Sequence, residues 1–152
     1  MWILPTCGSL SQMSARERPL STHRVLVVED NEHISFMLDF MFRRAGYDVT
    51  AVDNGRDAQS AIENLEPFDM IILDLMLPYV SGYQLITEIR DNPVWQRVPI
   101  LVLSGKVMEE DVVKALELGA NDYVTKPFRP AELLARVRRL ITDRERLAQT
   151  RE

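Results

Sequence analysis

The chain has a single cysteine, Cys7, which excludes a disulfide within the chain and makes a reducing compartment the simpler interpretation. It has no apolar run near the roughly 20 residues that a membrane helix needs. Residues 1–4 are apolar, but Pro5 interrupts them and no basic segment precedes them, which argues against a signal peptide. The net charge of −5 lacks the basic excess of a dedicated nucleic-acid binder. We therefore expect a cytoplasmic protein that does not span a membrane and does not bind nucleic acid directly.

A length of 152 residues, of which 46% are hydrophobic and 27% charged, suits one soluble globular domain. Residues 1–22 show no sustained hydrophobic period, and we interpret them as a flexible leader. The globular domain is expected over 23–141, followed by a charged helical extension or linker stub over 142–152. Met13 is an alternative to Met1 as the start of translation, and the sequence does not decide between them.

Short apolar runs alternate with amphipathic segments along the rest of the chain. The runs predict strands at 25–28, 69–74, 100–103 and 123–125, and alternation at Tyr47, Val49 and Ala51 predicts one nearer an edge. Helical spacing predicts helices over 34–45, 58–65, 85–89, 108–116 and from Pro130 onward. Gly46 should end the first helix and Ser81 should cap the third. The residues expected on buried helix faces include Met37, Leu65, Met108 and Leu116, and the methionines are interpreted as core filling.

Five strands that alternate with five helices predict an α/β fold, with a doubly wound parallel sheet covered by helices on both faces. Right-handed crossovers between the strands constrain the winding. The carboxyl ends of all the strands then meet at one edge of the sheet, where open α/β sheets bind their ligands. A functional site is expected at that edge.

Polar side chains follow four of the predicted strands at this edge. Glu29 and Asp30 follow the first strand, Asp74 ends the third, Ser104 follows the fourth and Lys126 follows the fifth. Each of these residues alone has an ordinary explanation as a turn former, a helix N-terminal acid or a surface charge. Their joint placement at one edge points to a site.

Three converging carboxylates would repel one another and raise a pKa unless a cation lies among them. Oxygen ligands of this kind suit Mg²⁺, which also shares phosphate oxygens. Asp74 could then stay ionised and attack phosphorus in line, while Lys126 stabilises charge on the transferring phosphoryl oxygens. Ser104 could hydrogen-bond a phosphate oxygen. The residues therefore predict that Asp74 is a nucleophile that accepts a phosphoryl group.

The chain from about His23 to Ile141 resembles the receiver domain of two-component response regulators, of the chemotaxis-protein-like superfamily. The motifs that carry the resemblance are Val-Val-Glu-Asp-Asn at 27–31, Ile-Leu-Asp-Leu-Met-Leu-Pro-Tyr-Val-Ser-Gly at 72–82, Leu-Ser-Gly at 103–105 and Gly-Ala-Asn-Asp-Tyr-Val-Thr-Lys-Pro-Phe at 119–128. The resemblance implies a flavodoxin-like (βα)5 fold with strand order 2-1-3-4-5. It also implies a signalling protein rather than an enzyme, phosphorylated by a sensor histidine kinase or a histidine phosphotransfer protein.

The resemblance assigns Asp74 as the phosphoacceptor and Glu29 and Asp30 as its acid pocket. It implies that Asp30, Asp74 and the backbone carbonyl of Met76 bind Mg²⁺. Glu29 stands where many members of the family carry Asp, and its longer side chain is expected to reach the metal through water.

The resemblance also assigns Lys126 as the lysine that contacts phosphate, with a cis peptide between Lys126 and Pro127. Ser104 and Tyr123 would form a switch pair, although the commoner residue at the first of these positions is Thr. Phosphorylation would then alter the surface of the fourth helix, fifth strand and fifth helix, which signals to an effector domain or an output protein.

Two alternatives come from other classes of protein. A phosphatase of the haloacid dehalogenase type also uses an aspartyl nucleophile, but it needs a second Asp two residues later, where this chain has Met76. A flavodoxin-like cofactor binder would need a loop that cradles phosphate after the first strand, whereas Glu29-Asp30-Asn31-Glu32 would repel phosphate.

A weak homodimer is a further expectation, and two surfaces could form it. Asp122, Glu132 and Arg136 resemble part of the charged dimer face of receivers joined to winged-helix DNA-binding domains. The basic residue usual on that face is absent at Val112, although Lys114 lies nearby.

The end of the last helix offers the second surface. Its residues Leu133, Val137, Leu140, Arg144 and Leu147 recur at four-three spacing. We predict a continuous helix to at least residue 147, and the sequence leaves open whether its end is a dimer element or a solvated helix end.

Overall fold

The computed structural model describes residues 22–150. The predicted leader lies outside the described residues except for Thr22, and so do Cys7 and Met13.

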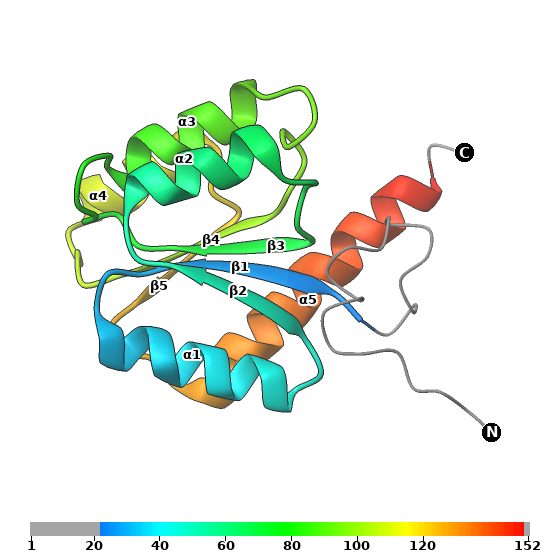
Figure 1. Ribbon diagram of the computed structural model, residues 1–152, viewed down its shortest axis with the longest axis horizontal. Coiled ribbons are helices and arrows are strands. Elements are labelled where there is room, and N and C mark those ends of the chain that lie inside the picture. The colour runs from blue at the N-terminus through cyan, green and yellow to red at the C-terminus, as the bar shows by residue number, and fades with distance from the viewer. Residues whose placement is uncertain (1–21, 151–152) are drawn as a thin grey trace.

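Five strands alternate with five helices in the predicted order (Figure 1). The strands are β1 (Arg24–Val28), β2 (Asp48–Val52), β3 (Met70–Leu73), β4 (Ile100–Ser104) and β5 (Asp122–Thr125). The helices are α1 (Glu32–Arg44), α2 (Gly55–Asn64), α3 (Gly82–Asp91), α4 (Glu109–Leu118) and α5 (Pro130–Gln149). All strand pairs are parallel, in the order β2-β1-β3-β4-β5. The predicted doubly wound fold and its strand order are confirmed.

The sheet separates two hydrophobic cores. Figure 1 shows α1 and α5 on one face and α2, α3 and α4 on the other. Successive strand residues point to opposite faces, so Leu26 and Ile71 pack under α2 and α3, while Val27 and Ile72 pack under α1 and α5. Because both faces of the central strands are covered, their sequences are continuously apolar rather than alternating.

Local signals in the sequence end and begin the helices as predicted. The Ser81 hydroxyl accepts a hydrogen bond from the N–H of Gln84 at the start of α3. Gly46 follows α1 with φ of +98°, a conformation that costs a residue with a Cβ more than it costs glycine. Pro130 occupies the first turn of α5.

Fewer residues of the helical segments are buried than the sequence pattern predicts. Met37, Leu65, Met108 and Leu116 are 44–59% exposed, so their assignment to buried faces is wrong. A helix that lies on a sheet presents only a stripe of its surface to the sheet, and α4 buries only Ala115.

Some methionines are also less buried than the sequence pattern predicts. Met41 and Met70 fill the core, whereas Met37 is about half exposed and Met76 and Met108 are largely exposed. The general interpretation of the methionines as core residues is therefore wrong for these three. On the edge strand β2, Ala51 is exposed while Val49 is buried.

Helix α5 runs to Gln149, which confirms the predicted continuous helix. Leu133 and Val137 are fully buried against the sheet of their own domain, so they are not available to a partner helix. Arg144 donates a hydrogen bond to the carbonyl of Phe68 at 3.2 Å, which fastens the extension to the segment before β3. Within residues 22–150, no helix has the length and apolar character needed to cross a membrane.

Candidate functional site

Backbone hydrogen bonds extend the sheet one residue past the strands and fix the predicted site residues at one edge. The N–H of Asp74 donates to the carbonyl of Val28 at 3.0 Å, and the N–H of Lys126 donates to the carbonyl of Ser104 at 2.9 Å. The acidic pair that follows β1 lies at the same edge. The structure therefore brings together the residues that the sequence assigned to the site.

Lys126 joins two of the carboxylates. Its ammonium donates a hydrogen bond to Asp74 Oδ2 at 3.0 Å and forms an ion pair with Glu29 Oε1. The peptide between Lys126 and Pro127 is cis, as the resemblance implied. Asp74 Oδ1 accepts the N–H of Met76 at 3.3 Å.

Burial shapes the charge of this cluster. Glu29 is only 2% exposed, and burial together with nearby Asp74 raises its pKa to about 7, against the opposing effect of Lys126. Burial also opposes the charge of Lys126, but the two carboxylates outweigh it and raise the pKa of the ammonium. The site therefore holds a charged lysine beside a glutamate that titrates near neutral pH.

Glu29, Asp30 and Asp74 could hold a divalent cation. Their carboxylate oxygens lie within 4.8 Å of one another, with Asp30 exposed and the other two buried. Three carboxylates face one ammonium, so the ionised cluster carries two uncompensated negative charges, the charge that Mg²⁺ would balance. Hard oxygen donors with one side open to water are the donor set that Mg²⁺ prefers.

The raised pKa of Glu29 predicts a pH dependence of stability in metal-free buffer. The folded pKa lies above the ordinary value of 4.5, so the folded state binds more protons than the unfolded state between pH 4.5 and 7. Stability should therefore fall as the pH rises through this window. Relative to Glu29→Gln, wild type should lose up to about 3 kcal/mol between pH 5 and 8. Urea unfolding in EDTA measures the difference, and parallel pH profiles of the two proteins would contradict it.

The two predicted switch residues both contact the backbone of Lys106. Ser104 is fully buried, and its hydroxyl oxygen accepts the N–H of Lys106 at 3.2 Å. The Tyr123 hydroxyl donates to the carbonyl of Lys106 at 2.7 Å, and burial raises its pKa. The loop after β4 thus connects β5 to the site edge.

The sequence did not indicate that Tyr83 takes part in this region. Its hydroxyl donates to the carboxylate of Asp111 at 3.3 Å, and burial together with that carboxylate raises its pKa to about 12. The Lys114 ammonium lies 4.3 Å from the centre of its ring, and the Lys106 ammonium lies 5.6 Å away. These contacts link α3 to α4 and to the loop before α4. Tyr83 and Asp111 are 28 positions apart, so no local pattern could reveal their contact.

The charged residues that suggested a dimer face pair within the chain. Arg136 contacts Asp122 at 3.0 Å and Glu132 at 3.0 Å. The homodimer stays a prediction that the structure of one chain does not test.

The fold and the site together define a class of protein, a phosphoacceptor domain with an aspartate, an acidic pair and a lysine at the carboxyl edge of a doubly wound sheet. The chain belongs to the response regulator receiver domain family, whose model matches residues 25–138. It is thus a receiver domain of two-component signalling, and the predicted resemblance is confirmed.

Two curated relatives of the chain are transcriptional regulatory proteins. The chain is 40% identical over 129 residues to the alkaline phosphatase synthesis transcriptional regulatory protein PhoP of Bacillus subtilis, covering 85% of this chain and 52% of that protein. It is 42% identical over 150 residues to a probable transcriptional regulatory protein of Picosynechococcus, covering 93% of this chain and 59% of that protein. The chain therefore spans a little over half the length of these relatives.

Solved structures show the same fold. A response regulator from Chloroflexus aurantiacus is 36% identical with a TM-score of 0.73, covering 80% of this chain and 98% of that one. The receiver domain of a sensor histidine kinase from Pseudomonas aeruginosa, solved with magnesium in its active site cleft, has the same identity, TM-score and coverage. These comparisons give no support to the phosphatase alternative.

Proposed function

We propose that Asp74 accepts a phosphoryl group from a sensor histidine kinase or a histidine phosphotransfer protein. The contact between the Lys126 ammonium and Asp74 Oδ2 at 3.0 Å carries this proposal. It places a fixed positive charge beside the carboxylate that would receive the phosphoryl group, at the ligand-binding edge of the sheet. Membership of the receiver family supports it.

The two oxygens of Asp74 have different surroundings. Oδ2 is held by Lys126, whereas Oδ1 accepts the backbone N–H of Met76. We therefore assign Oδ1 the attack: an oxygen–phosphorus bond forms while the bond from phosphorus to the donor's leaving group breaks. Lys126 then stabilises the charge on the phosphoryl oxygens.

Asp30, Asp74 and the carbonyl of Met76 would hold Mg²⁺ directly, and Glu29 would contact it through water. The acidic cluster and the magnesium in the Pseudomonas aeruginosa receiver support this assignment. When bound, the ion neutralises charge on the phosphoryl oxygens. Glu29 is already paired with Lys126, which suits an indirect role toward the ion.

We propose that the chain acts as a signalling module rather than as an enzyme that turns over a substrate. Its location would be cytoplasmic, which the single cysteine and the receiver family support. Its output would pass through the surface of α4, β5 and α5 to an effector domain or a partner protein. The transcriptional regulators among its relatives support an effector that acts on DNA.

The test is phosphorylation by acetyl phosphate, a small acyl phosphate donor. Wild type should gain one phosphoryl group that is stable in acid and labile in base, and EDTA should prevent the gain. Intact-protein mass spectrometry measures both. No incorporation with Mg²⁺ present would contradict the proposal.

Ser104→Ala should leave phosphorylation intact but weaken the response of the α4, β5 and α5 surface. The buried hydroxyl of Ser104 accepts the Lys106 N–H, so its proton can be donated to an arriving phosphoryl oxygen. A hydrogen bond to a charged group contributes about 1.5–3 kcal/mol. A shift from 1:99 to 99:1 needs about 5.5 kcal/mol, so Lys126 and Tyr123 must contribute as well.

NMR spectra of wild type and Ser104→Ala, with and without a beryllofluoride mimic of the phosphoryl group, measure this response. We expect smaller shifts in α4, β5 and α5 for Ser104→Ala. Equal shifts in the two proteins would show that the hydroxyl does not couple the site to that surface.

A further inference from the structure

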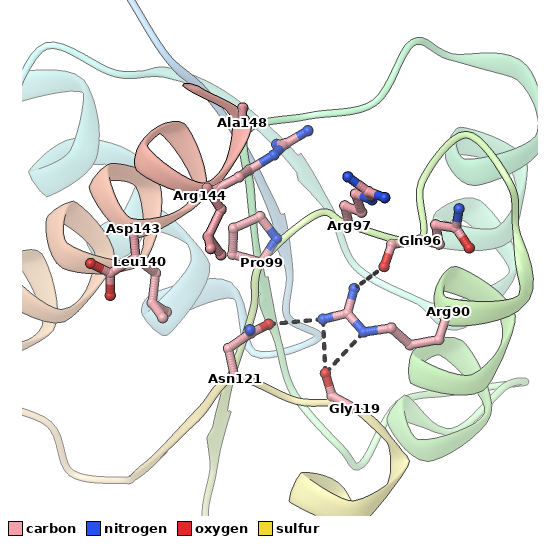
Figure 2. Close-up of a pocket in the computed structure, with 11 residues that line it drawn as sticks. Arg90, Gln96, Arg97, Pro99, Gly119, Asn121, Leu140, Asp143, Arg144 and Ala148 are labelled. Atoms are coloured by element: carbon pink, nitrogen blue, oxygen red, sulfur yellow. Dashed lines mark hydrogen bonds between the residues drawn. The ribbon is translucent and has the colours of Figure 1, made fainter. Parts of the chain in front are cut away.

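A groove of about 640 Å³ lies at the edge of the sheet opposite Asp74, between the end of α5 and the segments that lead into β4 and β5 (Figure 2). Its apolar wall consists of Pro99, Leu140, Leu147 and Ala148. Since Leu147 and Ala148 lie beyond the part of α5 that packs on the sheet, the helix extension builds one side of the groove. The volume is typical of pockets that bind small molecules.

Arg90 lines one side of the groove, and none of its guanidinium N–H groups is free to bind a ligand. Its five N–H groups are directed at the carbonyls of Gly119, Gln96 and Val98 and at Asn121 Oδ1. Figure 2 shows the bonds to Gly119, Gln96 and Asn121 as a network at one end of the groove. Arg90 therefore holds the wall in place rather than offering a contact to a ligand.

Two other arginines that line the groove have donors to spare. Arg97 makes no hydrogen bond or ion pair with any residue in the described range, and Arg144 uses one N–H, toward the carbonyl of Phe68. Figure 2 shows both guanidinium groups on the side of Pro99 that lies away from Asn121. The amide nitrogen of Asn121 likewise donates to no described residue, which adds another donor to the lining.

The charge of the lining is positive although the whole chain is acidic. Asp143 is the one carboxylate among the lining residues, and it lies 3.9 Å from Arg139. Burial lowers the pKa of Arg144, and the nearby carboxylates of Asp69 and Glu145 only partly offset that effect. An anion in the groove would stabilise the charged form of this guanidinium.

We propose that this groove binds a small amphiphilic anion, with a carboxylate or phosphate head at Arg97 and Arg144 and an apolar body against Pro99, Leu140 and Leu147. The donors are suited to either head group, because a guanidinium binds both in the same bidentate manner. The site is separate from Asp74, so the proposal does not depend on the phosphoacceptor function.

The test is an NMR titration of the isotopically labelled chain with decanoate and with decyl phosphate, each kept below the concentration at which it forms micelles. We expect shifts at residues 97, 119–121 and 140–148 and none at Asp74 or Ser104. Decanol and decyltrimethylammonium share the apolar chain without the negative head, and they should bind at least about tenfold more weakly. The stronger of the two anions identifies the head group.

Arg97→Ala should weaken binding of both anions about tenfold or more, since it removes a charge-assisted contact from a residue that makes no contact needed for folding. Arg146→Ala removes the same charge from α5 outside the groove lining and should bind like wild type. Leu147→Ser should weaken binding through the apolar wall, and Leu147 is 65% exposed, so the fold should not depend on it.

Four results would overturn the proposal: no shifts at millimolar anion, shifts located elsewhere, equal binding of the cationic probe, or wild-type binding by Arg97→Ala. Phosphorylation of Arg97→Ala by acetyl phosphate should equal that of wild type in every case. Failure of the groove and failure of the phosphoacceptor function are therefore distinguished.

Discussion

Asp74→Asn should lose the phosphoryl group that wild type gains from acetyl phosphate and Mg²⁺, with incorporation falling to background. The neutral amide is a much poorer nucleophile than a carboxylate and does not provide the acyl phosphate of aspartate. It also removes the negative charge that Lys126 contacts at 3.0 Å. Intact-protein mass spectrometry after an acid quench measures the remaining incorporation.

Asp53→Asn is the matched control, because Asp53 follows β2 at the same edge and is exposed. It should be phosphorylated like wild type. Circular dichroism should show that both variants are folded. Labelling of Asp74→Asn at the wild-type level would place the nucleophile on another residue.

Arg90→Leu should destabilise the protein by about 3–5 kcal/mol, because hydrogen bonds to a charged group contribute about 1.5–3 kcal/mol each and do not add fully. The change removes five donated hydrogen bonds, of 2.7–3.0 Å, that tie α3 to the segments before β4 and β5. The carbonyls of Gly119 and Val98 would lose these donors. Urea denaturation measures the loss in the free energy of unfolding.

Arg97→Leu is the control for this prediction. Arg97 is a nearby exposed arginine that makes no hydrogen bond or ion pair with a described residue, so the change should cost less than about 0.5 kcal/mol. A loss below about 1 kcal/mol for Arg90→Leu would show that water replaces the network at little cost.

The strands could be predicted well because their signal is local and strong. Residues 25–28 and 100–103 are continuously apolar, and both segments are buried on the two faces of the sheet. The helix ends at Gly46 and Ser81 were predicted equally well, since each depends on the chemistry of one residue and its near neighbours. The site followed from the fold, because parallel strands bring their carboxyl ends to one edge.

The sequence predicted less well which residues of the helices are buried. Met37 and Leu116 satisfy helical periodicity but remain half exposed, because the width of the buried stripe depends on how closely each helix lies on the sheet. The sequence also did not show where the apolar face of α5 packs. Its four-three spacing resembles a coiled coil, but Leu133 and Val137 pack within their own domain.

The sequence by itself determined the five strands, their parallel order through the family resemblance, and the set Glu29, Asp30, Asp74, Ser104 and Lys126 at one edge. Those features depend on residue type and spacing along the chain. The tertiary structure decided the pairing of Lys126 with Asp74, the contact of Tyr83 with Asp111 and the groove beside Arg97. Each of these joins residues at least 28 positions apart or on different elements, and their energies depend on distance, direction and burial, which only the folded chain fixes.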